Sequence, residues 1–390
     1  MNSTLTIDRQ RGVALLAAIV LVFAVTVILT NIFYRHQIEV SQLASSLHND
    51  QALLIALSGE GWAIELLRDD LTDPETNDSD HTGEIWAQAM PLLPVEGGTL
   101  TGCISDLQSR INLNNFSRYN ASALQTELNQ FDKIGFAKTW LSLLELLDIP
   151  PSPARVATIV DWIDTDATVI NSWGAEQPDY EGFDPPRVVA NAELVETTEL
   201  ADIAGYTIAE VQALLPWVSA LPLKQQGSVL PINVNTADNE LLFALSGSYG
   251  QQFVDAIIDG RPFSVGQVHE HLNDYLGLRD PANNNVGRAD SIWAKDLITE
   301  TSNYFQLYLK AQIGEAELEV ISIIERSNGP QADVNVIARE IAKVPAVLPK
   351  KTELTEMNKQ NRQDNLSDNL QQGADIDADS VQPACLMMDV

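Results

Sequence analysis

An uninterrupted apolar run over residues 13–33 dominates the N-terminal part of the chain, and no charged residue follows until Arg35. A helix of about 20 apolar residues is long enough to cross the hydrocarbon core of a bilayer. Arg9 and Arg11 precede the run, and basic residues favour the cytoplasmic side of a span. The pattern therefore predicts a single transmembrane segment over residues 13–34, with the rest of the chain on the opposite side of the membrane.

Apolar positions continue at helical spacing beyond the span as far as Leu67, until Asp73 and Pro74 end the pattern. The polar stretch 72–83 predicts a loop. Residues 99–107 and 110–114 then alternate between apolar and polar with a period of two, which predicts a pair of strands. A long helix followed by strands indicates that the second half of the helix packs on a sheet.

The middle of the chain has helical patterns at 121–164, 193–221 and 237–275, and an acidic loop rich in Gly and Pro follows the first of them. Alternation returns at 304–311, 317–324 and 334–339, which predicts three antiparallel strands. The fold class is therefore α+β, with a long N-terminal helix packed on an antiparallel sheet and a large inserted α-helical domain. We divide the chain into residues 1–12, 13–34, 35–116 (helix and first strands), 117–300 (inserted helical domain, acidic loop 161–191), 301–344 (C-terminal strands) and 345–390 (a polar, acidic tail expected to be disordered).

Composition narrows the functional classes. The 390 residues carry a formal net charge of −31, which repels the phosphates of nucleic acids and favours divalent cations. The sequence contains two cysteines, Cys103 and Cys385, so one disulfide is possible. His269 and His271 are two residues apart and would lie on different faces of a helix, and we find no catalytic constellation. The expectation is a protein that is not an enzyme and does not bind nucleic acid.

The acidic loop is the best candidate for a metal site. Oxygen ligands without nearby His or Cys select a hard cation, and Ca²⁺ accepts six to eight of them from a flexible loop. An EF-hand is excluded, because counting from Asp164 places Val169 where glycine is required and Ala175 where glutamate is required. The alternative is a solvated acidic surface, with Asp161 capping a helix or pairing with Arg187. The predicted calcium ligands are Asp164, Asp166, Glu176, Asp179 and Asn191.

The junction before the apolar run resembles the leader of a type IV pilin-like protein. In that family a prepilin peptidase cuts after the glycine, which places the cut here between Gly12 and Val13. Most pilins and pseudopilins have a glutamate as the fifth mature residue, but Ala17 occupies that position. The K-type minor pseudopilins of type II secretion also lack this glutamate, and the chain resembles that family.

Five short strings continue the resemblance in the same order along the chain. Two departures occur, with Ser109 where the family has glycine and Pro186 where it has a bulky residue before Arg187. A helix-hairpin-helix-like part over residues 232–275 lacks a basic patch, which favours packing or partner docking over DNA contact. The strings lie at residues 106–115, 161–166, 174–180, 186–191 and 232–237.

The resemblance implies a minor pseudopilin, anchored in the inner membrane by one span with its bulk in the periplasm. It implies N-terminal methylation after cleavage, calcium in the helical domain, and I-type and J-type minor pseudopilins as partners in a tip complex that supports protein export. Secreted proteins are further possible partners. The alternative function is a signal-anchored periplasmic protein whose binding or adhesion depends on calcium, and a third is a DNA-uptake pseudopilin that would use the helix-hairpin-helix-like part.

Overall fold

The computed structural model describes residues 11–74, 76–130, 133–225, 227–279, 287–327 and 333–343. The expected leader before residue 11 and the expected disorder of the tail at 345–390 lie outside these residues.

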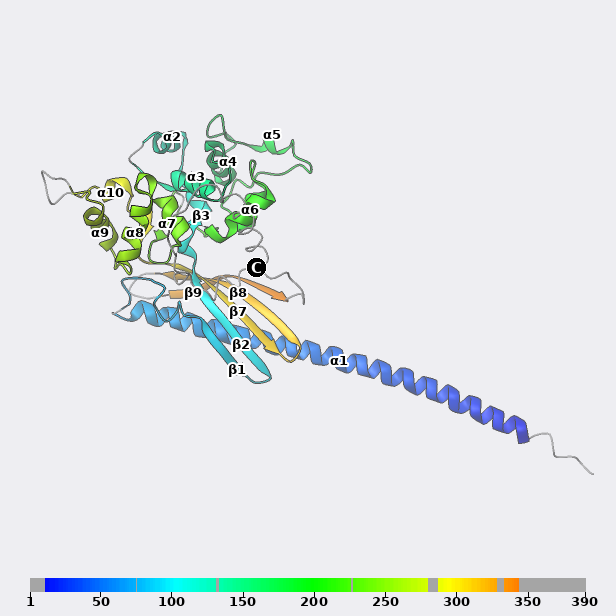
Figure 1. Ribbon diagram of the computed structural model, residues 1–390. Helices are drawn as coiled ribbons and strands as arrows, with labels where there is room; N and C mark the ends of the chain where they lie inside the picture. Colours follow the sequence, from blue (N-terminus) through cyan, green and yellow to red (C-terminus); the bar gives the residue numbers. More distant parts are fainter. Residues whose placement is uncertain are drawn as a thin grey trace, which may run out of the picture.

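A single helix, α1 (Arg11–Thr72), forms the N-terminal stem of the molecule (Figure 1). Its 62 residues correspond to a length of about 93 Å. The side chains at positions 15–47 are exposed, whereas Ala52, Ala56, Ala63 and Leu67 are completely buried against the sheet. The three alanines allow a close approach to the sheet, and a Cβ at Gly59 would lie 3.0 Å from the side chain of Leu100. The helix is therefore apolar and uncovered at one end and part of the core at the other.

The second half of α1 packs on a five-stranded antiparallel sheet with the strand order β1-β2-β7-β8-β9. The three antiparallel strands expected near the C-terminal end are confirmed. In β8 buried and partly exposed side chains alternate strictly, which is the period-two pattern of a sheet with one face on a core. The strands are β1 (Met90–Val95), β2 (Gly98–Asp106), β7 (Tyr304–Ile313), β8 (Ala316–Ser327) and β9 (Asp333–Lys343).

The chain between β2 and β7 forms a helical head beyond one end of the sheet (Figure 1). Its hydrophobic core includes Phe116, Trp140, Phe253 and Trp293 and is separate from the core under the sheet. The α+β fold class is thus confirmed, with the helices inserted between two neighbouring strands of the sheet. The helices are α2 (Ala121–Asn129), α3 (Phe136–Leu146), α4 (Pro153–Ile163), α5 (Gln177–Tyr180), α6 (Ile208–Leu214), α7 (Asn239–Leu245), α8 (Gln251–Gly260), α9 (Gln267–Tyr275) and α10 (Ala289–Ile292).

Two local expectations are wrong. The predicted strand at 110–114 is only β3 (Ile111–Asn112), which pairs in parallel with β4 (Val218–Ser219) and not with β2. Asn112 and Asn114 use their side chains to bind the backbone at Leu221 and Leu194, and such side-chain bonds compete with a regular ladder. The block 193–221 is helical only in part, over the short helix α6 and two 3₁₀ turns, and it ends in the short strand β4. A second small parallel pair joins β5 (Ile232–Asn233) to β6 (Ile298–Thr299).

Candidate metal centre

Helix α4 delivers the acidic loop from the core of the head. Ser152 caps its N-terminus and Pro153 occupies its first turn, where a missing N–H costs nothing. Val156, Ile159 and Val160 anchor the helix in the core. Helix α4 ends at Ile163, and the backbone of the next residue, Asp164, is extended. The acidic loop therefore starts from a helix that is fixed in the core.

Asp161 braces the loop from inside the protein. Its side chain is fully buried, and its two carboxylate oxygens accept hydrogen bonds from the backbone N–H groups of Ile170 and Ala175, each at 2.8 Å. A Cβ at Gly174 would lie 1.9 Å from Asp161 Oδ2, so the loop can pass this carboxylate only with glycine there. Burial raises the pKa of Asp161 to about 7 despite the two backbone hydrogen bonds. Asp161 therefore organises the loop.

The alternative partner considered for Asp161 is engaged elsewhere. Arg187 donates hydrogen bonds to the carbonyl oxygens of Ala201 at 3.1 Å and Asp202 at 2.8 Å. Its guanidinium also lies over the ring of Phe183 at 4.6 Å from the centroid. The positive charge of Arg187 thus serves to hold the far side of the loop and does not neutralise Asp161.

Three of the predicted ligands converge. One carboxylate oxygen from each of Asp164, Asp166 and Glu176 lies within 4.8 Å of the others. Glu176 is only 4% exposed, yet within the described part of the chain neither of its carboxylate oxygens has a hydrogen-bond partner, and the same holds for Asp164 Oδ1. Buried polar atoms are normally paired, so several unpaired oxygens facing one point indicate a site for a positively charged group.

Asn191 reaches the same place from the far end of the loop. Its backbone has a φ of 44°, in the left-handed region that Asn tolerates better than most residues. Its side-chain N–H₂ donates to the carbonyl oxygen of Asp166 at 3.1 Å, and its Oδ1 is buried with no partner among the residues described. Asp179 has a different role: its Oδ2 accepts from the backbone N–H of Glu176 at 3.0 Å and caps α5, outside the three-carboxylate group.

The electrostatics of this group are unfavourable as it stands. Burial raises the pKa of Asp164 and of Glu176, and repulsion from neighbouring carboxylates raises both further. Within the described parts of the chain, neither Lys nor Arg forms an ion pair with Asp164, Asp166 or Glu176. Carboxylate and amide oxygens are the ligands of hard cations, and Asp164, Asp166, Glu176 and Asn191 are the residues that could hold one.

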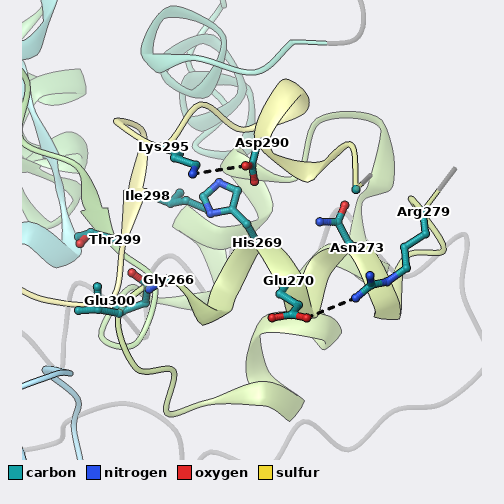
Figure 2. A pocket seen from close by; sticks show the side chains of 12 residues that line it. Gly266, His269, Glu270, Asn273, Arg279, Asp290, Lys295, Ile298, Thr299 and Glu300 are labelled. Carbon is teal, nitrogen blue, oxygen red and sulfur yellow. Dashed lines mark hydrogen bonds and ion pairs between the residues drawn. The ribbon is translucent and has the colours of Figure 1, made fainter. Parts of the chain in front are cut away.

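A pocket lies elsewhere in the head, beside α9 (Figure 2). Its volume is about 480 Å³. The charged side chains that line it pair with one another, Lys295 with Asp290 and Arg279 with Glu270, each at 3.5 Å. His269 contacts the carbonyl oxygen of Trp293 at 3.0 Å across the head. His271 contacts that of Ala256 at 2.8 Å, so the two histidines join different segments and do not converge.

The predicted processing point lies at the start of the stem. Gly12 and Val13 fall in the first turn of α1, which begins at Arg11. From Leu15 onward this helix is long and apolar enough to span a membrane, and none of its most apolar stretch is buried within the chain. A single N-terminal apolar helix therefore fits a single-pass anchor.

The sequence left a disulfide open, and in the structure Cys103 in β2 is disulfide-bonded, whereas Cys385 lies outside the described residues. One further feature was not identified from the sequence. A second group of carboxylates, Asp70, Asp80 and Glu84, assembles beyond the end of α1. The sequence signal for it was weak, because the three residues fall in a helix end and a polar loop.

Comparison with known proteins places this architecture in a family. The family model described as "Type II secretion system (T2SS), protein K" matches residues 109–223. Type II secretion system protein K of Klebsiella pneumoniae is 31% identical over 322 residues, which cover 82% of this chain and 93% of that protein. The protein K of Aeromonas hydrophila is 28% identical over 328 residues, with coverages of 82% and 93%.

A solved structure has the same fold. A chain in the crystal structure of the GspK-GspI-GspJ complex from the enterotoxigenic Escherichia coli type 2 secretion system superposes with a TM-score of 0.60. It is 24% identical in sequence, and the match covers 78% of this chain and all of the other. Together with the sequence relatives, this shows that the chain belongs to the type II secretion system protein K family.

Proposed function

We propose that this chain is the minor pseudopilin at the tip of a periplasmic pseudopilus, where it supports protein export across the outer membrane. The observation that carries the proposal is the continuity of α1. One end is an uncovered apolar rod, and the other is built into the core of a folded domain. A rod of this kind requires a hydrophobic environment, which a membrane supplies before assembly and neighbouring helices supply afterwards.

The partners that we propose are the I-type and J-type minor pseudopilins. The related solved structure is a complex of GspK with GspI and GspJ, which supports this assignment by similarity of fold. Leu43 and Leu47 are exposed, lie one helical turn apart and stand beyond the proposed span. They are therefore suitable side chains for contacts with a second stem.

In the cell we place the chain in the inner membrane with its bulk in the periplasm. The basic residues before the span support this orientation. Prepilin peptidase would cut between Gly12 and Val13, and the new N-terminus would be methylated. Family membership favours this function over that of a calcium-dependent adhesion protein, which no separate observation supports.

Co-purification of the full-length, detergent-extracted chain with the I-type and J-type proteins tests the assembly. Burying one leucine contributes about 1.5–3 kcal/mol, so Leu43→Glu with Leu47→Glu should weaken association at least about tenfold. Gln42→Glu, on a different face of the helix, is the matched control and should retain the partners. Unchanged co-purification of the double variant, or a purified chain that still begins at Met1, would contradict the proposal.

We also propose that Ca²⁺ occupies the acidic loop, held by Asp164, Asp166, Glu176 and Asn191, with Asp179 positioning Glu176. The unpaired buried oxygens support this assignment. If calcium is present at about 100 times its dissociation constant, it contributes about 2.7 kcal/mol to folding. A chelator should then lower the melting temperature of the full-length protein by roughly 5 to 10 °C.

Variants that conserve the shape of the ligands separate calcium binding from general effects on folding. Asp164→Asn with Asp166→Asn should abolish the difference between melting curves with and without chelator. Glu181→Gln removes an exposed carboxylate from the same loop and should leave that difference intact. Identical curves for the parent protein with and without chelator would rule out the site.

A further inference from the structure

The last turn of α1 and the polar segment after it bring three carboxylates together at the junction between the stem and the sheet. One oxygen from each of Asp70, Asp80 and Glu84 lies within 4.8 Å of the others. Asp80 and Glu84 are 1% and 5% exposed, so this group is more deeply buried than the acidic loop of the head. We call Asp70, Asp80 and Glu84 the junction cluster.

One basic residue compensates part of this charge. Arg326 on β8 donates to Asp70 Oδ2 at 2.8 Å and also to Asp80 Oδ1. The backbone N–H of Ser302 donates to Asp80 Oδ2 at 2.7 Å. Because each carboxylate oxygen can accept more than one bond, these contacts do not exhaust the cluster. Arg326 thus supplies one positive charge for three carboxyl groups.

The two carboxylate oxygens of Glu84 differ in their contacts. Oε2 accepts from the indole N–H of Trp86, whereas Oε1 is buried and has no hydrogen bond among the residues that the structure describes. His81 Nε2 lies 3.4 Å from Oε1, while His81 Nδ1 accepts from the backbone N–H of Gly83 at 3.1 Å.

We propose that the junction cluster binds a hard divalent cation, with Ca²⁺ as the best fit. Bonds between Ca²⁺ and oxygen are about 2.3–2.6 Å long, so oxygens on opposite sides of the ion lie up to roughly 5 Å apart, as they do here. Asp70, at the edge of the cluster, leaves access for the waters that complete the coordination.

The position of the cluster indicates what the ion does. Asp70 belongs to α1, and Arg326 belongs to the sheet. The polar segment after α1 is bonded to the head, because Asn233 Nδ2 donates to the carbonyl oxygen of Asp80 at 3.0 Å and the backbone N–H of Val265 donates to that of Asp78 at 2.9 Å. A cation held here ties stem, sheet and head at one point. This site is separate from the acidic loop and does not depend on the proposed function.

Terbium luminescence provides a direct test, because Tb³⁺ replaces Ca²⁺ at oxygen sites and is sensitised by a nearby indole. Trp86 contacts Glu84 and is the natural donor. The protein is the full-length chain in detergent, with Asp164→Asn and Asp166→Asn to disable the acidic loop. In this background we expect saturable emission on tryptophan excitation that Ca²⁺ displaces.

Glu84→Gln should weaken Tb³⁺ and Ca²⁺ binding at least tenfold, whereas Asp78→Asn, an exposed carboxylate in the same segment, should leave it unchanged. Glutamine at position 84 can still accept from the indole of Trp86, so we expect this variant to fold. Melting curves check that it does. In chelator the Glu84→Gln protein should melt no lower than its parent, and only the parent should gain stability with Ca²⁺. The absence of displaceable emission from the parent, or equal binding by the Glu84→Gln protein, would overturn the proposal.

Discussion

The carboxylate of Glu60 is buried where α1 crosses the sheet, and residues of two strands hold it. Arg339 on β9 donates to both of its oxygens, at 2.8 and 2.5 Å, and the hydroxyl of Ser322 on β8 donates at 2.5 Å. Burial alone would raise the pKa of Glu60, but the hydrogen bonds and the charge of Arg339 outweigh it and lower the pKa below its ordinary value of 4.5. This bidentate pair fastens the last strand of the sheet to the stem.

A group whose pKa is lowered by folding stabilises the protein above its unfolded pKa and loses that contribution as the pH falls through the folded value. Because Arg339 is partly exposed, we expect Glu60→Gln to reduce the free energy of unfolding by only about 1–2 kcal/mol at pH 7. The difference from the parent should narrow as the pH falls below 4.5. Denaturant titrations at a series of pH values measure both effects.

The control for this prediction is Glu65→Gln, because Glu65 pairs with Arg68 on the exposed face of α1. Exposed substitutions of this kind change stability by about 0.5 kcal/mol or less. A loss of stability in Glu60→Gln that does not vary with pH would show that the charge of Glu60 is not what stabilises the contact.

Residues of the two acidic clusters differ in how far their sequence positions reveal them. Asp164, Asp166 and Glu176 share one loop, so a local excess of carboxylates was enough to predict that they converge. The role of Asp161 needed the structure, because its partners are backbone N–H groups of the loop that it organises. The junction cluster depends on Arg326, 256 positions from Asp70, and a contact so distant leaves no local pattern.

At the scale of elements, the prediction succeeded where one physical pattern dominates. Strand β8 alternates throughout its length because one face lies on α1, and the stem is apolar over more than five turns. It failed at Ile111 and Asn112, where the alternation is real but buried asparagines bind distant backbone groups instead of a neighbouring strand. Strand β1 was missed because its side chains are mostly exposed at the sheet edge, so burial imposes no alternation on them.

At the scale of the whole molecule, the head explains why this subunit would occupy the end of a fibre. All of the helices from α2 to α10 are inserted between adjacent strands of the sheet, so they add a second hydrophobic core beyond a small stem domain. A thin helical fibre repeats its subunits side by side, and a head of this size would obstruct a neighbour in front. Ala17 is consistent with such a position, because a stem without a carboxylate there cannot pair through it with the N-terminal amine of a subunit in front.

Ala17→Glu tests this position in the fibre. The side chain is exposed on α1 and far along the helix from the head, so we expect unchanged membrane insertion and an unchanged melting temperature of the head. The rates of pseudopilus initiation and of secretion should fall severalfold. The new carboxylate could pair with the N-terminal amine of another subunit and so draw that subunit into a position ahead of the tip. Ala18→Glu carries a similar cost of placing a charge in the apolar helix but points about 100° away, so it cannot recruit that subunit in the same way. Normal secretion by the Ala17→Glu protein, or an equal loss with Ala18→Glu, would show that the missing glutamate does not mark the tip.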